Sequence, residues 1–125
     1  MRLLLDTHVL LWCLADDPTL PENVRNTVVD SSNSVFVSAV SGWEIAIKKA
    51  LGKLEAPDDL PEAIALSRFE PMSITLAHAM KAGFLPRHHD DPFDRMLIAQ
   101  SILEGCTLVT RDHRINAYGI PILPA

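Results

Sequence analysis

Short apolar segments alternate along the chain with longer segments of helical periodicity, and no other feature of the sequence restricts the fold as much. The apolar segments rarely place polar residues at alternate positions, which is typical of parallel strands buried on both faces. Strands are expected at Arg2–Leu5, Ser34–Val37, Phe69–Ser73, Thr107–Thr110 and Ile120–Leu123. Helices are expected at Thr7–Leu14, Pro21–Ser31, Ser38–Leu51, Pro61–Ser67, Thr75–Gly83 and Pro92–Glu104, with a helical turn at Asp112–Ala117. The pattern predicts an α/β fold with a parallel sheet and helices on both faces.

The size and composition favour one domain over residues 1–125, built on a single sizeable core. No apolar segment is long enough to span a membrane, and Asp6 and His8 interrupt the apolar start of the chain, so we expect a cytoplasmic protein without a signal peptide. Cys13 and Cys106 lie far apart in apolar surroundings and are predicted to be reduced core thiols. The net charge of −5 argues against a broad basic surface for nucleic acid, but not against an enzyme that meets phosphates through a metal ion.

Two aspartates follow predicted strands, at the edge where open α/β sheets bind their ligands. Asp6 comes directly after Arg2–Leu5, and Asp112 lies two residues beyond Thr107–Thr110. The alternative is that each aspartate only caps the helix that follows, because aspartate is a favoured cap residue.

Glu44 lies within a helical stripe in which it is the only polar residue. The stripe consists of Val40, Glu44, Ile47 and Leu51. We therefore expect Glu44 on or beside the buried face, where an unpaired carboxylate is costly or has a shifted pKa. The alternative is a surface salt bridge to Lys48, one turn further along the helix.

Asp94 lies in the first turn of the segment PFDRMLIAQSIL, where an acid interacts favourably with the helix dipole. Leu97 and Ile98 follow one turn later, so Asp94 is expected on a flank that becomes core. The dipole explains an acid in the first turn, but not one that lies above a buried stripe.

Carboxylates that converge beside a core repel one another unless a cation balances their charge. The four candidate residues for a catalytic and metal-binding site are Asp6, Glu44, Asp94 and Asp112. An all-oxygen ligand set suits Mg²⁺ or Mn²⁺ and does not suit zinc, so the predicted chemistry is metal-assisted attack of water on a phosphodiester.

The histidines show no zinc-binding spacing. His88 and His89 precede Asp90 and Asp91 in a predicted loop, where a phosphate contact or a general acid is one interpretation and a solvated pair is the favoured one. Five cationic residues are candidates to contact the phosphates of such a substrate, and for each the simpler interpretation is a solvated surface charge. They are Lys48, Lys49, Arg95, Arg111 and Arg114.

Four segments resemble successive motifs of the PIN-domain nucleases and, more narrowly, of the VapC-type toxins of bacterial type II toxin–antitoxin pairs. They are LLLDTHVLLW, SAVSGWEIAIK, HHDDPFDRMLIAQ and LVTRD, and together they extend over nearly the whole chain. The resemblance implies a sheet order of 3-2-1-4-5, with the strands before Asp6 and Asp112 as neighbours. It also implies cleavage of RNA with Mg²⁺ or Mn²⁺, a homodimer, and a cognate antitoxin protein that lies along the groove and blocks the site.

The resemblance also implies roles for individual residues. Asp6, Glu44 and Asp94 match the metal-binding acids of the family, and Asp112 matches a more variable fourth acidic position. Thr7 and Thr110 match small hydroxyl residues beside the metal. Asp91 belongs to a subgroup motif and is expected to be structural, capping the helix or tying down the loop.

Two other functions stay open at the level of sequence. One is a catalytically silent PIN-like module that binds a partner protein, against which the complete acidic set argues. The other is an aspartyl-phosphate enzyme or receiver domain with Asp6 as acceptor. It ranks lower because position 8 holds His8 instead of a second aspartate, and because no lysine follows the later strands as a receiver requires.

Overall fold

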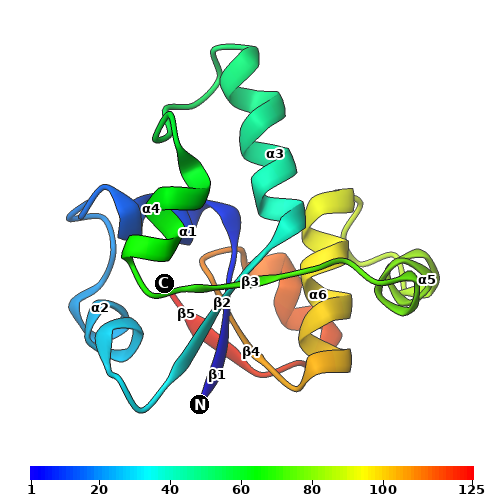
Figure 1. Cartoon of the computed structure of the whole chain (residues 1–125). Coiled ribbons are helices and arrows are strands. Elements are labelled where there is room, and N and C mark those ends of the chain that lie inside the picture. Colours follow the sequence, from blue (N-terminus) through cyan, green and yellow to red (C-terminus); the bar gives the residue numbers. More distant parts are fainter.

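Five parallel strands form the central sheet of the computed structural model, which describes residues 1–125 (Figure 1). The strands are β1 (Arg2–Leu5), β2 (Ser34–Ser38), β3 (Glu70–Met72), β4 (Thr107–Thr110) and β5 (Ile122–Pro124). They lie in the order β3-β2-β1-β4-β5, and every neighbouring pair is parallel. The predicted α/β class and the order 3-2-1-4-5 are therefore confirmed.

Helices cover both faces of this sheet (Figure 1). They are α1 (Thr7–Leu14), α2 (Glu22–Val29), α3 (Ala39–Ala50), α4 (Leu60–Leu66), α5 (Leu76–Phe84), α6 (Pro92–Glu104) and a 3₁₀ helix, η1 (His113–Tyr118). Alternate residues of β1 enter two separate cores, as the period of a strand requires. Leu3 and Leu5 pack with α1, α2 and α4, whereas Leu4 packs with α5, α6 and η1.

The predicted apolar stripe of α3 is only half correct. Val40 and Glu44 are buried, but Ile47 and Leu51 are exposed. The helix extends past the carboxyl edge of the sheet, so its later turns have no core to cover (Figure 1).

Several predicted boundaries were wrong by one or two residues. The segment predicted as Pro21–Ser31 is helical only over Glu22–Val29, because Asp30 is extended. Thr75 caps α5 instead of joining it, and the strand predicted at Ile120–Leu123 lies at Ile122–Pro124, where it pairs with β4. Helix ends are set by single capping residues, and sequence patterns locate these less well than they locate the core of an element.

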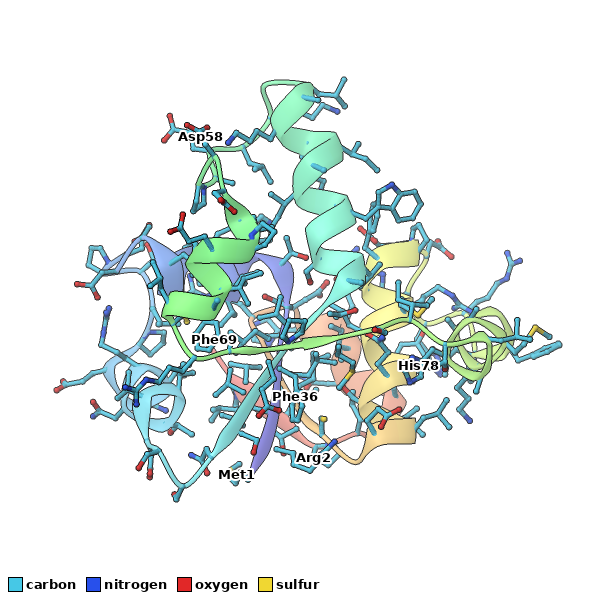
Figure 2. The ribbon with its side chains drawn as sticks, viewed as in Figure 1. Met1, Arg2, Phe36, Asp58, Phe69 and His78 are labelled. Carbon is cyan, nitrogen blue, oxygen red and sulfur yellow. The ribbon has the colours of Figure 1, made fainter.

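Near the amino-terminal edge of the sheet, the Arg2 guanidinium lies 4.7 Å from the centre of the Phe36 ring, and both residues are labelled in Figure 2. Cys13 and Cys106 are free thiols, as predicted, with Cys106 fully buried and Cys13 partly buried. No helix is both long enough and apolar enough to cross a membrane.

Candidate metal centre

A cleft of about 410 Å³ opens at the carboxyl edge of the sheet, beside the ends of β1 and β4. Its lining residues are Asp6, Thr7, His8, Trp12, Glu44, Lys48, Asp91, Asp94, Arg111, Asp112 and Arg114. All four acids that the sequence singled out therefore face one cleft, although they come from four separate segments of the chain.

Asp6 is held at the bottom of this arrangement by the turn from β1 into α1. Its side chain is 8% exposed and accepts a hydrogen bond of 2.8 Å from the backbone amide of Val9, so it caps α1 as well as facing the cleft. Burial raises the pKa of Asp6, and hydrogen bonds from the Thr110 hydroxyl and the Val9 amide oppose the rise. The capping interpretation is confirmed, and Asp6 also lines the cleft, where its role as a metal ligand stays a prediction.

Glu44 is 5% exposed and is held by two neighbours. The Thr7 hydroxyl donates to its Oε1 at 2.6 Å, and the Lys48 ammonium lies 2.5 Å from its Oε2. The predicted burial and the alternative salt bridge to Lys48 thus exist together. The hydrogen bond raises the pKa of Lys48, which stays charged and balances one carboxylate of the cleft.

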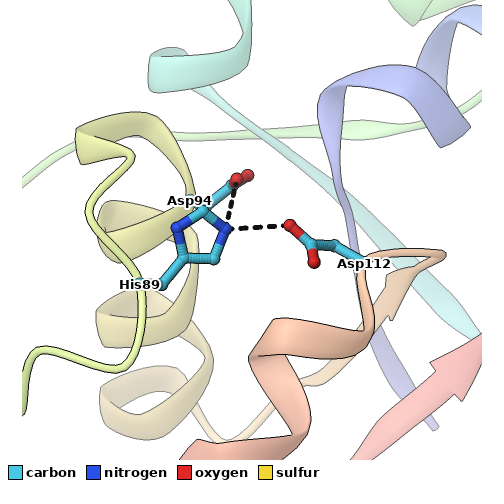
Figure 3. Close-up of side chains that lie close together, drawn as sticks. All are labelled: His89, Asp94 and Asp112. Carbon is cyan, nitrogen blue, oxygen red and sulfur yellow. Dashed lines mark hydrogen bonds and ion pairs between the residues drawn. The ribbon is translucent and has the colours of Figure 1, made fainter.

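Asp94 and Asp112 are bridged by one imidazole, that of His89 (Figure 3). The Nε2 atom of His89 lies 3.0 Å from Oδ2 of Asp94 and 2.8 Å from Oδ2 of Asp112. His89 is 3% exposed, so the expectation of a solvated histidine pair was wrong for this residue. Its neighbour His88 is exposed and contacts Tyr118 edge to face. Nothing in the local spacing of His89 marks it as buried, because its burial depends on the path of the loop.

The electrostatics of the two bridged aspartates differ. Burial raises the pKa of Asp94 to about 7, and the negative charges of Asp91, Asp6 and Glu44 add to the rise. Arg114 lowers the pKa of Asp112, with a smaller contribution from His89, because its guanidinium donates to both carboxylate oxygens at 3.1 and 2.9 Å. Burial and the neighbouring carboxylates thus disfavour the charged form of Asp94, whereas the charged form of Asp112 is paired with Arg114.

The five cationic candidates divide into two groups. Lys48, Arg111 and Arg114 line the cleft. Lys49 instead binds the carbonyls of Ala56 and Pro57 together with Asp58, outside the cleft.

Arg95 also lies outside the cleft lining and is bound by the protein itself, so it is not the solvated surface charge that was its simpler interpretation. Its guanidinium donates to the backbone carbonyls of Ala82, Gly83, Leu85, Pro86 and His89. These bonds close the end of α5 and fix the loop before α6. Asp91, in contrast, caps α6 as expected, accepting from the amides of Phe93 and Asp94.

The residues of the cleft fit a hard divalent cation. Carboxylate oxygens are the ligands that Mg²⁺ and Mn²⁺ prefer, and four carboxylates that line one cleft repel one another unless a cation balances them. The side chains whose possible ligand atoms lie within 4.8 Å of one another are His89, Asp94 and Asp112. Asp6 and Glu44 line the same cleft but do not belong to this close group.

A larger cavity of about 530 Å³ lies elsewhere, lined by residues of α2 and of the segment before β3. Its two acids are already engaged, since Asp16 pairs with Arg25 and Asp30 accepts from Ser32. It therefore lacks the group of converging acids that lines the cleft.

Comparison with known proteins agrees with this fold. The family model of the PIN domain matches residues 3–121. A ribonuclease of Mycobacterium tuberculosis, VapC22, is 28% identical over 94% of this chain and 92% of its own length. The structure of VapBC2 from Rickettsia felis bound to a DNA fragment of its promoter superposes with a TM-score of 0.73 at 17% identity, covering 99% of this chain and 98% of that one. A toxin–antitoxin complex from Klebsiella pneumoniae gives a TM-score of 0.63 at 20% identity, covering 96% and 94% of the two chains.

Proposed function

The chain belongs to the PIN domain family, and from this membership we propose that it is a metal-dependent endoribonuclease that hydrolyses RNA phosphodiester bonds. The proposal assigns the activity to residues 1–125 as one domain. The observation that carries it is the convergence of four acids from distant segments on one cleft. The ribonuclease named among its relatives supports the choice of RNA as substrate.

Asp6, Glu44 and Asp94 are the proposed metal ligands and catalytic residues, and Asp112 assists them. A bound Mg²⁺, for which Mn²⁺ can substitute, supplies Lewis acidity and a nucleophilic water at neutral pH. The chain itself provides the orientation of the ligands. The Thr7 hydroxyl fixes Glu44, and the Val9 amide fixes Asp6.

The substrate backbone is proposed to enter beside the cations of the cleft. Arg114 is exposed at the rim, and Lys48 is partly exposed deeper in. Both side chains can interact with phosphate oxygens, and they supply local positive charge in a protein whose net charge is −5. Recognition of RNA is then local and does not depend on a broad basic surface.

The proposed biological role is that of the toxin of a toxin–antitoxin pair, acting in the cytoplasm and inhibited by a cognate antitoxin protein. Structural neighbours that are toxin–antitoxin complexes support the partner. Two free cysteines and the RNA substrate are consistent with a cytoplasmic protein.

We also propose that the protein is a homodimer. Helix α5 presents Leu76, Met80 and Phe84 at a spacing of four residues, with exposed fractions of 78%, 52% and 79%. Three large apolar side chains that form one exposed stripe are typical of an interaction surface, whereas single exposed apolar residues are not. A second copy of the chain is the proposed occupant of this stripe.

The test is cleavage of a defined RNA by the purified protein. We expect cleavage with Mn²⁺ or Mg²⁺, none with EDTA, and none with the Asp6→Asn variant. If RNA stays intact with both ions while the protein still binds an antitoxin, the protein is a silent binding module and the proposed activity is wrong.

A further inference from the structure

His89 is the one buried imidazole in the cleft region, and backbone groups hold it from several sides. Its own amide donates to the Tyr118 hydroxyl at 3.0 Å, and its carbonyl accepts from Arg95 at 3.2 Å. Arg95 also fixes the preceding turn through Leu85 and Pro86. The ring is therefore placed by a loop that is itself anchored on both sides.

The backbone selects the tautomer of this ring. The amide of Asp91 donates to Nδ1 of His89 at 3.1 Å. A backbone amide cannot accept, so Nδ1 presents its lone pair and the ring proton lies on Nε2. The Nε2–H group then points at the two aspartates.

One ring nitrogen thus lies between two carboxylates from different elements, and its hydrogen bond is directed to Asp112. Asp94 belongs to the first turn of α6, and Asp112 lies between β4 and η1. Their Oδ2 atoms lie 3.0 and 2.8 Å from the same nitrogen (Figure 3). The other donors to Asp112 come from Arg114, so His89 is the side chain that joins Asp112 to Asp94.

We propose that His89 is a positioning residue of the metal centre. Its Nε2–H donates to Asp112 and lies 3.0 Å from Asp94, and it thereby keeps the two carboxylates together in the orientation that binds the cation. This inference rests on the proposed function and deepens it. Residues that hydrogen-bond to the ligands of a metal orient those ligands, and the loss of such a residue costs about 10–100-fold in metal affinity or activity.

Direct ligation by His89 is the competing interpretation, since its ring and the two aspartates lie close enough to surround an ion. Ligation through Nε2 needs a lone pair on that atom and therefore a proton on Nδ1. A proton on Nδ1 would face the N–H of Asp91 at 3.1 Å, and two donors would oppose each other. The geometry thus favours His89 as a donor to the ligands instead of a ligand.

Two substitutions of His89 distinguish the roles of its two ring nitrogens. In His89→Gln, the amide nitrogen takes nearly the place of Nε2 and can still donate to the aspartates. In His89→Asn, the amide oxygen takes nearly the place of Nδ1 and can still accept from Asp91, but no donor reaches both aspartates. Calorimetric titration with Mn²⁺, supported by melting curves in EDTA, compares both variants with the unaltered chain.

We expect His89→Asn to weaken Mn²⁺ binding about tenfold or more, and His89→Gln to stay within about threefold of the unaltered chain. Unchanged binding in His89→Asn would overturn the proposal. Equal losses in both variants would also overturn it, because the glutamine keeps the donor. Lack of Mn²⁺ binding by the unaltered chain would instead refute the proposed function, and the inference with it.

Pulsed electron paramagnetic resonance of the Mn²⁺-loaded chain provides a readout that needs no variant. A directly bound imidazole gives nitrogen modulation of the Mn²⁺ signal, whereas an imidazole that only donates a hydrogen bond to a carboxylate ligand does not. We expect no such modulation, and its presence would make His89 a ligand. This measurement decides the question even if His89→Asn fails to fold.

Discussion

The Lys48 ammonium lies 2.5 Å from the Glu44 carboxylate, inside the cleft where the four acids meet. A lysine thus supplies to Glu44 the positive charge that a divalent cation would bring. The pair is partly accessible, since the lysine side chain is 32% exposed. A bound cation and Lys48 are therefore expected to compete for the same carboxylate.

Lys48→Met should destabilise the metal-free protein by about 1–2 kcal/mol, because it leaves the buried Glu44 carboxylate without its charged partner. The stabilisation gained on adding Mn²⁺ should be larger in this variant than in the unaltered chain. Melting curves with EDTA and with saturating Mn²⁺ measure both quantities. Equal gains in the two proteins would show that Glu44 and the cation do not interact.

Asp6→Asn and Asp94→Asn should each lower RNA cleavage by roughly 10²–10³-fold, because each removes a proposed ligand of the cation. Both variants should remain folded, and in EDTA they should be as stable as the unaltered chain or more so, since carboxylate repulsion is relieved. Asp90→Asn, an exposed acid of the neighbouring loop, is the matched control and should retain activity. An active Asp94→Asn variant would remove this residue from the site.

The stability of the metal-free protein should depend on the protonation of Asp94. Its pKa in the folded protein is about 7, against an ordinary value of 3.8. Between these values the folded chain holds a proton that the unfolded chain has released, so stability falls as the pH rises from about 4 to about 7. Denaturant titrations in EDTA across this range should show the fall, and Asp94→Asn should remove its share of it. A difference between the two proteins that does not vary with pH would contradict the assignment.

Arg95→Met should cost about 2–3 kcal/mol of stability, because it removes hydrogen bonds from a charged group to five backbone carbonyls. Amide hydrogen exchange should become faster in the loop before α6. Arg87→Met, which changes an exposed arginine of the same loop, should have little effect on either measurement. If Arg95→Met instead weakened RNA binding without a loss of stability, Arg95 would be a phosphate contact after all.

Phe84→Glu should convert the proposed homodimer into a monomer, because it places a charge within the apolar stripe of α5. Light scattering coupled to gel filtration measures the mass directly. Lys81→Glu, which reverses an exposed charge on the same helix, controls for the change in net charge. A monomeric unaltered chain, or a dimeric Phe84→Glu variant, would exclude this interface.

The sequence specified the fold well where several local signals agreed. Helix α6 begins at Pro92 and ends at Glu104 as predicted, because Asp91 caps it, proline suits its first turn, and Gly105 adopts the left-handed conformation after it. The four acids could be selected because each follows a strand or interrupts an apolar pattern.

The sequence could not reveal features that depend on how distant segments pack. The stripe through Ile47 and Leu51 predicted a buried face, but periodicity does not show where the sheet beneath a helix ends. The roles of His89 and Arg95 follow from the three-dimensional path of the loop between α5 and α6, to which no residue spacing points. Long-range contacts of this kind override local pattern, and here they decide the environment of Asp94.

The most direct test of the account is an anomalous difference map from crystals of the protein soaked in Mn²⁺. The account predicts a peak in the cleft, within coordination distance of carboxylate oxygens of Asp6, Glu44 and Asp94. A peak at another site, or none in the cleft while the crystallised protein cleaves RNA, would contradict it.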